Sequence, residues 1–388
     1  MTATSVDVLV VGGGPGGLCA AWRLAAEGYS VLVCEEHASI GDPVHCTGVL
    51  AADAFDEFGL DSGSLLNELS TVHFVSPGGL RVSHTTPQVE AVVIDRVRFD
   101  QDLAAMAQSA GAVLKLGTRV TALETDATGV RARAGEEAIR ARVVVLACGA
   151  RYVFQQRLGL GLPSDYLHTA QRELPAARLG DVEVHFGAAV APSGFAWAVP
   201  VARPSGPHVR IGVMAMRGTP TWYRDMQARI AESWGVAPDT HAPRVKILPL
   251  GPITRTVSDR VVAIGDAAGV VKPTTGGGIY YSLLTATMAA DVVADGLADG
   301  RLDAQALAPY EQRWAQHLAG EIDAQRELRR IATNMTDQEI DALFDLATTD
   351  GIMPIVRKTA QFNHHRHLIR ALLSHPPARR VLFRALAG

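Results

Sequence analysis

Three closely spaced glycines near the start of the chain have the types and spacing to bind phosphate. Gly12, Gly14 and Gly17 are arranged as G-x-G-x-x-G. In such a loop the first glycine permits a tight turn, the second lets a pyrophosphate approach the backbone, and the third lets a helix pack closely on a strand. The spacing predicts a dinucleotide-binding loop.

Two acids, Glu35 and Glu36, stand where a dinucleotide site needs a ribose ligand. A carboxylate at the end of the second strand can accept hydrogen bonds from a ribose 2′-hydroxyl. Both are candidates for cofactor binding, and we favour Glu35 because strand alternation turns it the same way as Val31 and Val33. A glycine-rich turn without a ligand would not account for the acid.

The elements around this loop occur in the order that the site requires. Residues 6–11 are apolar except for Asp7, as in a parallel strand covered on both faces. Pro15 in this loop is a further candidate for cofactor binding, and Gly28 suits the end of the helix that follows. A second strand at 29–34 then leads to the acids. The helix N-terminus would present free N–H groups and a positive dipole end to phosphates.

A second glycine-rich stretch lies about 250 residues further on and has the same character. A strand at 260–264 delivers Gly265 and Asp266, and Asp266 could hold a sugar hydroxyl. Three glycines then open a long apolar helix over 278–297, whose positive end would face a bound group. The predicted cofactor contacts in this stretch are Gly265, Asp266, Gly276, Gly277, Gly278 and Ile279.

Composition is typical of a soluble globular enzyme and gives no sign of a nucleic-acid partner. The 388 residues are 48% hydrophobic and 20% charged, with a net charge of −4. The chain begins with a strand and no basic segment, so we expect no signal peptide. Four cysteines without metal-ligand spacing favour reduced thiols, no metal site and a cytoplasmic protein.

The order of the elements predicts an α/β protein with a discontinuous Rossmann-like domain. Residues 72–94 and several later segments alternate in the manner of antiparallel strands, whereas the strand at 260–264 returns to the parallel type. We predict a nucleotide-binding domain over 1–71, 90–155 and 255–300, an inserted antiparallel-sheet substrate domain over 72–89 and 156–254, and a C-terminal helical region over 301–388.

Several helices are expected between these strands. Residues 50–70, 95–111 and 221–234 have helical patterns, and 306–388 are mostly helical. Thr336 to Glu339 has the spacing of a capping box, which would start one of the C-terminal helices.

The motifs together resemble those of FAD enzymes with the para-hydroxybenzoate hydroxylase fold. The resemblance rests on the first glycine loop, on the residues DR and FD at 95–100, and on Gly265-Asp266. Within that superfamily, the segments at 41–48 (GDPVHCTG), 195–200 (FAWAVP) and 272–278 (KPTTGGG) resemble the geranylgeranyl reductase family. The similarity covers about residues 5–300.

The resemblance implies roles for further residues. Cys46 would lie beside the flavin and act in catalysis, with Arg96 and Val120 also contacting the cofactor. Arg96 could instead pair with Asp95 or Asp100. Trp197 would line the substrate cavity and take part in catalysis. The remaining substrate-binding candidates are His45, Phe195, Pro200 and Lys272. The family's aromatic motif usually has Tyr and Phe where this chain has Phe195 and Val199, so the pocket would be less polar at one point and smaller at another.

Members of that family reduce isolated double bonds of prenyl chains, which implies an FAD-dependent reductase of a long apolar substrate. The alternatives are an FAD-dependent monooxygenase or halogenase on an aromatic or polyketide-like substrate, and a flavin-bearing redox relay. No second G-x-G-x-x-G follows a later strand. The external electron donor, NAD(P)H or a ferredoxin-type protein, would therefore bind transiently or in another manner.

The end of the chain is a candidate for peripheral membrane contact. From Gln361 onward it holds five arginines and four histidines but no acid, interleaved with apolar residues. Such a segment could meet an anionic bilayer that presents a prenyl lipid. A basic helix face packed on the body of the protein is the alternative.

Overall fold

A computed structural model describes residues 4–349 and 351–384, and its largest sheet carries the first glycine motif. Four neighbouring pairs in this eight-stranded sheet are parallel, and an antiparallel hairpin extends it. The order is β17 (Val257–Ser258), β18 (Val261–Ala263), β11 (Glu137–Leu146), β1 (Thr4–Val11), β2 (Val31–Cys34) and β8 (Val113–Lys115), with β10 (Gly129–Ala134) beside β11 and β9 (Val120–Asp126) beside β10.

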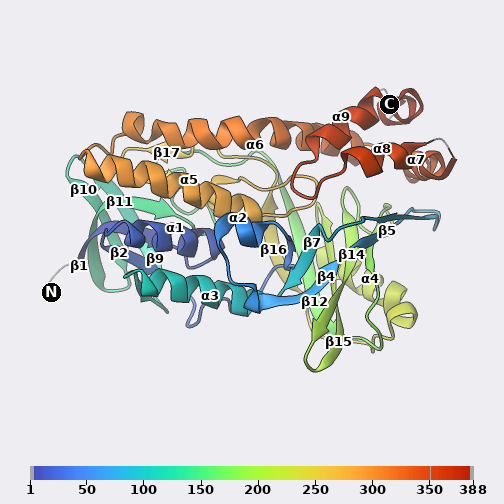
Figure 1. Cartoon of the computed structure of the whole chain (residues 1–388), viewed down its shortest axis with the longest axis horizontal. Helices are drawn as coiled ribbons and strands as arrows, with labels where there is room; N and C mark the ends of the chain where they lie inside the picture. The colour runs from blue at the N-terminus through green and yellow to red at the C-terminus, as the bar shows by residue number, and fades with distance from the viewer. Residues whose placement is uncertain (1–3, 350, 385–388) are drawn as a thin grey trace.

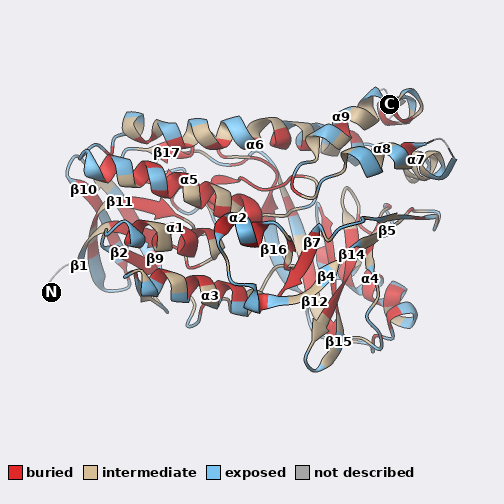
Figure 2. Ribbon diagram, in the orientation of Figure 1, coloured by how far each residue is buried: buried red, intermediate tan, exposed pale blue. Residues whose placement is uncertain are grey.

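Helices cover this sheet as the predicted α/β class requires. Helix α1 packs against α3 and α5, and α5 packs in turn against α6. Figure 1 shows α5 and α6 running alongside each other, and Figure 2 shows the buried residues concentrated where strands and helices face one another. The bounds are α1 (Pro15–Ala26), α3 (Arg96–Ser109), α5 (Ile279–Ala298) and α6 (Ala304–Thr333), with a 3₁₀ turn, η2 (Gly265–Ala268), before α5.

A second, seven-stranded sheet lies beyond the first, and α4 (Thr219–Trp234) packs against two of its strands, β12 and β15. All its neighbouring strands are antiparallel except the pair β13 and β5. Its order is β16 (Arg244–Pro249), β12 (Tyr166–Pro175), β15 (Gly206–Ala215), β14 (Phe195–Arg203), β13 (Val182–His185), β5 (Thr71–Val75) and β6 (Arg81–Thr85). The exact domain boundaries stay a prediction.

The segment 50–70 was expected to be helical, and this expectation is wrong for most of its length. It contains only a short helix, α2 (Ala54–Phe58), and a 3₁₀ turn, η1 (Ser62–Ser64). The rest joins a three-stranded sheet of β3 (Val49–Ala51), β7 (Ala91–Ile94) and β4 (Leu65–Leu69). The buried strand β7 pairs with both neighbours, so long-range pairing overrides the local helical pattern.

The C-terminal helices lie over the end of the molecule that holds the seven-stranded sheet (Figure 1). They are α7 (Asp337–Thr349), α8 (Ile352–Thr359), α9 (Arg366–Ser374) and α10 (Pro376–Arg384). The predicted capping box is confirmed at the start of α7. The Thr336 N–H donates to the Glu339 carboxylate at 2.9 Å, and the Glu339 N–H donates to Thr336 Oγ1 at 3.3 Å.

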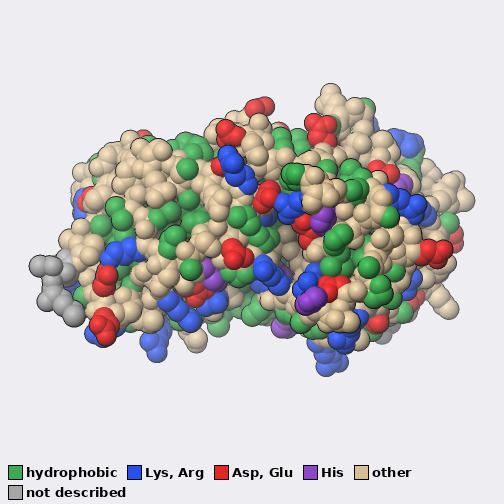
Figure 3. All heavy atoms as spheres, turned by 90° about the horizontal axis from the view of Figure 1, so that it is seen from below, with side chains coloured by type: hydrophobic (Ala, Val, Ile, Leu, Met, Phe, Trp, Pro, Cys, Tyr) green, Lys and Arg blue, Asp and Glu red, His purple; other side chains and the backbone are tan. Residues whose placement is uncertain are grey.

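Within residues 4–349 and 351–384, no helix has the length and apolar character needed to cross a bilayer. On the face drawn in Figure 3, basic and acidic side chains are interspersed with apolar ones. The four cysteines are free thiols, and Cys19 and Cys34 are buried.

Candidate flavin and substrate site

The first glycine loop has the close packing that its spacing predicts. Gly12 has φ of +109°, and a Cβ there would lie 2.4 Å from the Ala147 carbonyl oxygen. A Cβ on Gly17 would lie 2.1 Å from the Gly12 oxygen, so the turn of the strand into α1 requires both glycines. A Cβ on Gly14 would meet nothing within 4 Å, because this residue faces open space.

Glu35 is turned toward this loop, as strand alternation predicts. It directly follows β2, and its carboxylate accepts hydrogen bonds from the N–H groups of Gly13 at 2.7 Å and His37 at 2.9 Å. Glu36 points elsewhere and pairs with Arg151 at 2.8 Å. Glu35 therefore holds the phosphate loop in shape, and its contact with a ribose stays a prediction.

The second glycine stretch brings another helix N-terminus to the same place. Helix α5 begins after Gly278, and a Cβ on Gly278 would lie 2.7 Å from Asp266 Oδ1. The backbone oxygen of Asp266 accepts a hydrogen bond from the Tyr152 hydroxyl at 2.7 Å, which fixes the 3₁₀ turn. Lys246 lies 3.8 Å from the Asp266 carboxylate.

Both glycine motifs border one cavity of about 750 Å³. Helices α1 and α5 each follow a glycine, which has no side chain to cap the first N–H groups, so these groups remain for a ligand. Such an arrangement fits FAD. The cavity walls include these predicted residues: Gly14, Pro15, Gly17, His45, Cys46, Arg96, Phe195, Trp197, Asp266, Gly276, Gly277, Gly278 and Ile279.

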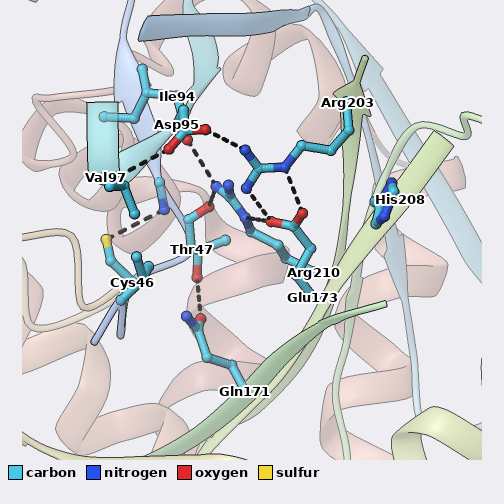
Figure 4. A network of polar contacts seen from close by, with 12 residues as sticks. Cys46, Thr47, Ile94, Asp95, Val97, Gln171, Glu173, Arg203, His208 and Arg210 are labelled. Carbon is cyan, nitrogen blue, oxygen red and sulfur yellow. Dashed lines mark hydrogen bonds and ion pairs between the residues drawn. The ribbon is translucent and has the colours of Figure 1, made fainter. Parts of the chain in front are cut away.

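Cys46 lies in the loop before β3 and lines this cavity. Its sulfur accepts a hydrogen bond from the Gly48 N–H at 3.3 Å (Figure 4). The Arg96 guanidinium contacts the Cys46 side chain and donates to both Asp100 oxygens, at 2.8 and 2.9 Å. Burial alone would lower the pKa of Arg96, but its interactions with Asp100 and Cys46 outweigh burial and raise that pKa. The guanidinium therefore stays protonated.

His45 also lines the cavity, and its ring Nε2 lies 2.9 Å from Thr169 Oγ1. Burial, assisted by the positive charges of Lys246 and Arg244, lowers the pKa of His45 to about 4. The ring is therefore neutral at physiological pH, and it contributes a hydrogen bond to the cavity wall and no charge.

A buried charge network, which sequence reasoning missed, fixes the Cys46 loop to the seven-stranded sheet (Figure 4). Arg210 Nη1 donates to the backbone oxygens of Thr47 at 2.6 Å and Ile94 at 3.1 Å, and Arg210 Nε donates to Glu173 at 2.8 Å. Arg203 donates to Glu173 as well, at 2.7 and 2.9 Å, and to Asp95. Glu173 and Arg210 are directly paired across β12 and β15, which only the register of the two strands reveals.

This network has a clear electrostatic balance. Burial would raise the pKa of Glu173, but hydrogen bonds and charges from Arg203 and Arg210 outweigh it and hold that pKa below its ordinary value. Glu173 is thus ionised at neutral pH and compensates the nearly fully buried Arg210. The Cys46 loop is consequently held by a neutralised, rigid anchor.

Aromatic side chains form another part of the cavity wall. Trp197 and Phe195 both line the cavity, and their ring centroids are 5.7 Å apart. The ring of Trp197 lies directly over Gly212, where a Cβ would be 2.1 Å from the indole. The Trp197 Nε1 atom is buried without a hydrogen-bond partner among the described residues. The indole therefore contributes to the cavity wall while its buried N–H is left without a partner.

Some predicted site residues do not line this cavity. Val120 is buried at the start of β9, and Pro200 lies within β14. Gly12, Glu35 and Gly265 pack within or beneath the two loops, and Glu36 pairs with Arg151. Lys272 is buried, and its ammonium group donates to the Phe362 carbonyl at 2.9 Å and Asn363 Oδ1 at 2.7 Å. It therefore holds the C-terminal segment, which sequence reasoning did not foresee.

The C-terminal helices complete the cavity. Phe362, Leu343 and Phe344 line it together with residues of α6. The Glu321 carboxylate accepts the backbone N–H groups of His365, at 2.9 Å, and Arg366, at 3.0 Å, which ties the start of α9 to α6. This region, which has only a general helical signal in the sequence, therefore forms part of the cavity wall.

Comparisons with known proteins agree on the cofactor and the family. Residues 5–323 match the model of an FAD binding domain. A digeranylgeranylglycerophospholipid reductase of Methanocaldococcus jannaschii is 30% identical over 89% of this chain and 92% of its own. The cofactor is therefore FAD, as the resemblance to the flavin enzymes implied.

Solved structures agree on the fold. A geranylgeranyl bacteriochlorophyll reductase-like protein from Thermoplasma acidophilum, 21% identical, superposes with a TM-score of 0.85 over 99% of this chain and 100% of its own. A probable FAD-dependent monooxygenase from Pseudomonas aeruginosa, 18% identical, gives a TM-score of 0.69 over 88% of this chain and 100% of its own. The α/β fold predicted from the sequence is confirmed.

Proposed function

The chain belongs to the geranylgeranyl reductase family of FAD-dependent oxidoreductases, and we propose that it saturates carbon–carbon double bonds of a long, apolar isoprenoid substrate. One observation carries the proposal: a single cavity, apolar over most of its wall, extends from the uncapped helix N-termini to the aromatic pair and the C-terminal helices. A prenyl chain enters such a cavity with its tail desolvated. The relative from Methanocaldococcus jannaschii is named for a lipid of this kind.

When bound, reduced FAD supplies the hydride, from its N5 position. The N–H groups at the starts of α1 and α5 bind and orient the cofactor, and Glu35 keeps the phosphate loop in shape. An isolated alkene is a poor electrophile, so a proton must reach the second carbon as the hydride reaches the first. The residues around the cavity must supply or relay this proton.

Cys46 is the proposed proton donor. Its thiol lines the cavity, and loss of the proton would leave a thiolate beside the Arg96 guanidinium, whose charge is secure. His45 is a weaker candidate, because burial keeps its ring neutral. Trp197 and Phe195 exclude water and hold the apolar chain against the reacting face. An external donor, NAD(P)H or a ferredoxin-type protein, reduces the flavin for the next cycle.

The test is product analysis without oxygen. Reduced, FAD-loaded protein is incubated anaerobically with a digeranylgeranyl glycerophospholipid, and the products are weighed by mass spectrometry. We expect a gain of two hydrogens for each bond reduced. A hydroxylated or halogenated product that forms only with oxygen would favour the monooxygenase or halogenase alternative, and an unchanged lipid with a flavin that still cycles would favour a redox relay.

The role of Cys46 is tested separately. Cys46→Ala and Cys46→Ser should lower alkene reduction by about 100-fold, the usual contribution of a positioned proton donor, with FAD content unchanged. Cys148→Ala removes a thiol that lies outside the cavity wall and serves as the matched control. Full activity in both Cys46 variants would remove this thiol from the mechanism.

We also propose that the basic end of the chain contacts an anionic bilayer from which the lipid enters. Arg370 and Arg380 are exposed on α9 and α10, while Arg366 packs beside Gly320 of α6. The side chain of Arg384 lies outside the described residues. Co-sedimentation with vesicles of anionic phospholipid, lost when Arg370 and Arg380 are both changed to Gln, would support this contact. Equal sedimentation of the double variant would argue against it.

A further inference from the structure

Arg329, on α6, is a cation in the cavity wall that forms no ion pair with any carboxylate of the described residues. The hydrogen bond that its guanidinium makes within the described chain is from Nη2 to the Ser193 carbonyl oxygen, at 2.6 Å. No acid of the described chain influences its pKa; burial alone lowers that pKa, to about 10, and the group stays protonated at neutral pH. An arginine offers five N–H donors, so most of its capacity remains for a ligand.

The other two cations of the cavity wall differ from Arg329 in this respect. Arg96 is paired with Asp100 at 2.8 Å, and Lys246 lies 3.8 Å from Asp266. Asp337 also lines the cavity, but its carboxylate accepts the Ala188 N–H at 2.8 Å and forms no ion pair with Arg329. The charge of Arg329 is thus available to an anion.

The cavity wall that holds Arg329 is mostly apolar. Helices α6 and α7 contribute apolar residues to it, among them Leu328, Ala332, Ile340, Leu343 and Phe344. A charge in such a wall costs free energy unless a partner compensates it. An amphiphile with an apolar tail and an anionic end satisfies both the wall and the guanidinium.

We propose that Arg329 binds the anionic head group, a phosphate or a carboxylate, of an amphiphilic prenyl substrate. A guanidinium can donate two parallel hydrogen bonds to either group. The inference rests on the proposed function, because it assigns the polar end of the substrate to the site that reduces its tail. Arg329 is on this account a specificity-determining residue that fixes which bonds of the chain reach the flavin.

A purely structural role is the alternative. Arg329 donates to the carbonyl of Ser193, a residue with φ of +58°, and it could serve only to hold that turn. Such a role predicts that replacing Arg329 weakens the binding of charged and uncharged ligands equally. A head-group role predicts a loss confined to the charged ones, so the two roles separate by ligand charge.

The test uses saturated amphiphiles, which cannot be reduced, so its result does not depend on catalysis. Binding of dodecyl phosphate, dodecanoate, dodecanol and inorganic phosphate to FAD-loaded protein is measured by titration calorimetry. Arg329→Gln should weaken binding of dodecyl phosphate or dodecanoate by about 10- to 100-fold and leave dodecanol unchanged. Arg329→Lys should recover part of the loss.

Arg330→Gln is the matched control, because Arg330 is the next residue on α6 but is exposed and paired with Glu327 at 2.8 Å. It should bind every probe as the wild type does. Equal weakening of dodecanol and dodecyl phosphate in Arg329→Gln would overturn the proposal in favour of a structural role. Wild-type binding of dodecyl phosphate by Arg329→Gln, or binding of inorganic phosphate as tight as dodecyl phosphate in wild type, would also overturn it.

Failure of the proposed function would look different. If no prenyl lipid is reduced but Arg329 still discriminates dodecyl phosphate from dodecanol, the head-group site stands and the reaction assignment falls. If prenyl lipids are reduced and Arg329→Gln leaves the KM values of phosphate-bearing lipid and geranylgeraniol in their wild-type ratio, the reaction stands and this inference falls.

Discussion

A side chain at Gly48 should destabilise the protein more than a side chain at a turn glycine that faces open space. The reason is that Arg210 occupies the position of the added Cβ. Gly48 has φ of +67°, and a Cβ there would lie 2.3 Å from Arg210 Nη1 and 2.9 Å from the Ile94 oxygen. The Arg210 side chain cannot move away without losing its hydrogen bonds to Thr47, Ile94 or Glu173. Gly48→Ala must therefore displace either the buried network or the Cys46 loop.

The magnitude follows from two contributions. Placing alanine at a positive φ costs about 1–2 kcal/mol by itself. Overpacking against a buried side chain adds about 1–3 kcal/mol. Gly135, in the turn between β10 and β11, has φ of +62° and no heavy atom within 4 Å of its would-be Cβ, so Gly135→Ala carries the first cost without the second. The free energies of unfolding of the two variants should differ by about 1–3 kcal/mol.

The assay is urea unfolding of FAD-loaded protein, followed by tryptophan fluorescence, together with alkene reduction by the folded variants. We expect Gly48→Ala to be the less stable variant and to lose most of its activity, because the displaced loop carries Cys46. Gly135→Ala should keep its activity. Equal stabilities and equal activities of the two variants would refute the role of the network as the anchor of this loop.

Three further predictions concern the cofactor loop, the aromatic wall and the C-terminal segment. Glu35→Arg should purify with less FAD than wild type, whereas Glu27→Arg, an exposed charge reversal at the end of α1, should not; equally yellow preparations would count against Glu35. Gly212→Ala should displace the Trp197 ring and raise the KM for prenyl lipid about tenfold at unchanged FAD content; an unaltered KM would exclude the indole from binding. Burial lowers the pKa of Lys272 from 10.5 to about 7 in the folded protein. Between these two pH values Lys272 is protonated in the unfolded chain but largely neutral in the folded one. The free energy of unfolding therefore rises as the pH rises. The free energy of unfolding should rise with pH above 7 more in wild type than in Lys272→Met, and parallel profiles would contradict this.

The parts of the site that could be predicted from the sequence are those set by local spacing. Gly12, Gly17 and Glu35 belong to one strand–helix–strand unit, so their order in the chain already places them together. The second motif was predictable for the same reason, since Asp266 and Gly278 flank a single strand-to-helix connection. That both motifs border one cavity followed from the resemblance and is confirmed by the fold.

The parts that could not be predicted depend on contacts between distant segments. Arg210 and Glu173 lie on separate strands, and their link to the Cys46 loop exists only once the two sheets meet. The pairing of β4 with β7 replaced an expected helix for the same reason. Lys272 was expected at the substrate, but a segment some 90 residues away covers it.

The most direct test of the reductase assignment is a single turnover followed by the flavin itself. The FAD-loaded protein is reduced chemically, freed of oxygen and excess reductant, and mixed with a digeranylgeranyl glycerophospholipid. We predict that the visible absorption of oxidised flavin returns without oxygen, with one double bond lost for each flavin reoxidised. A flavin that stays reduced until oxygen is admitted, with the lipid unchanged, would contradict the account.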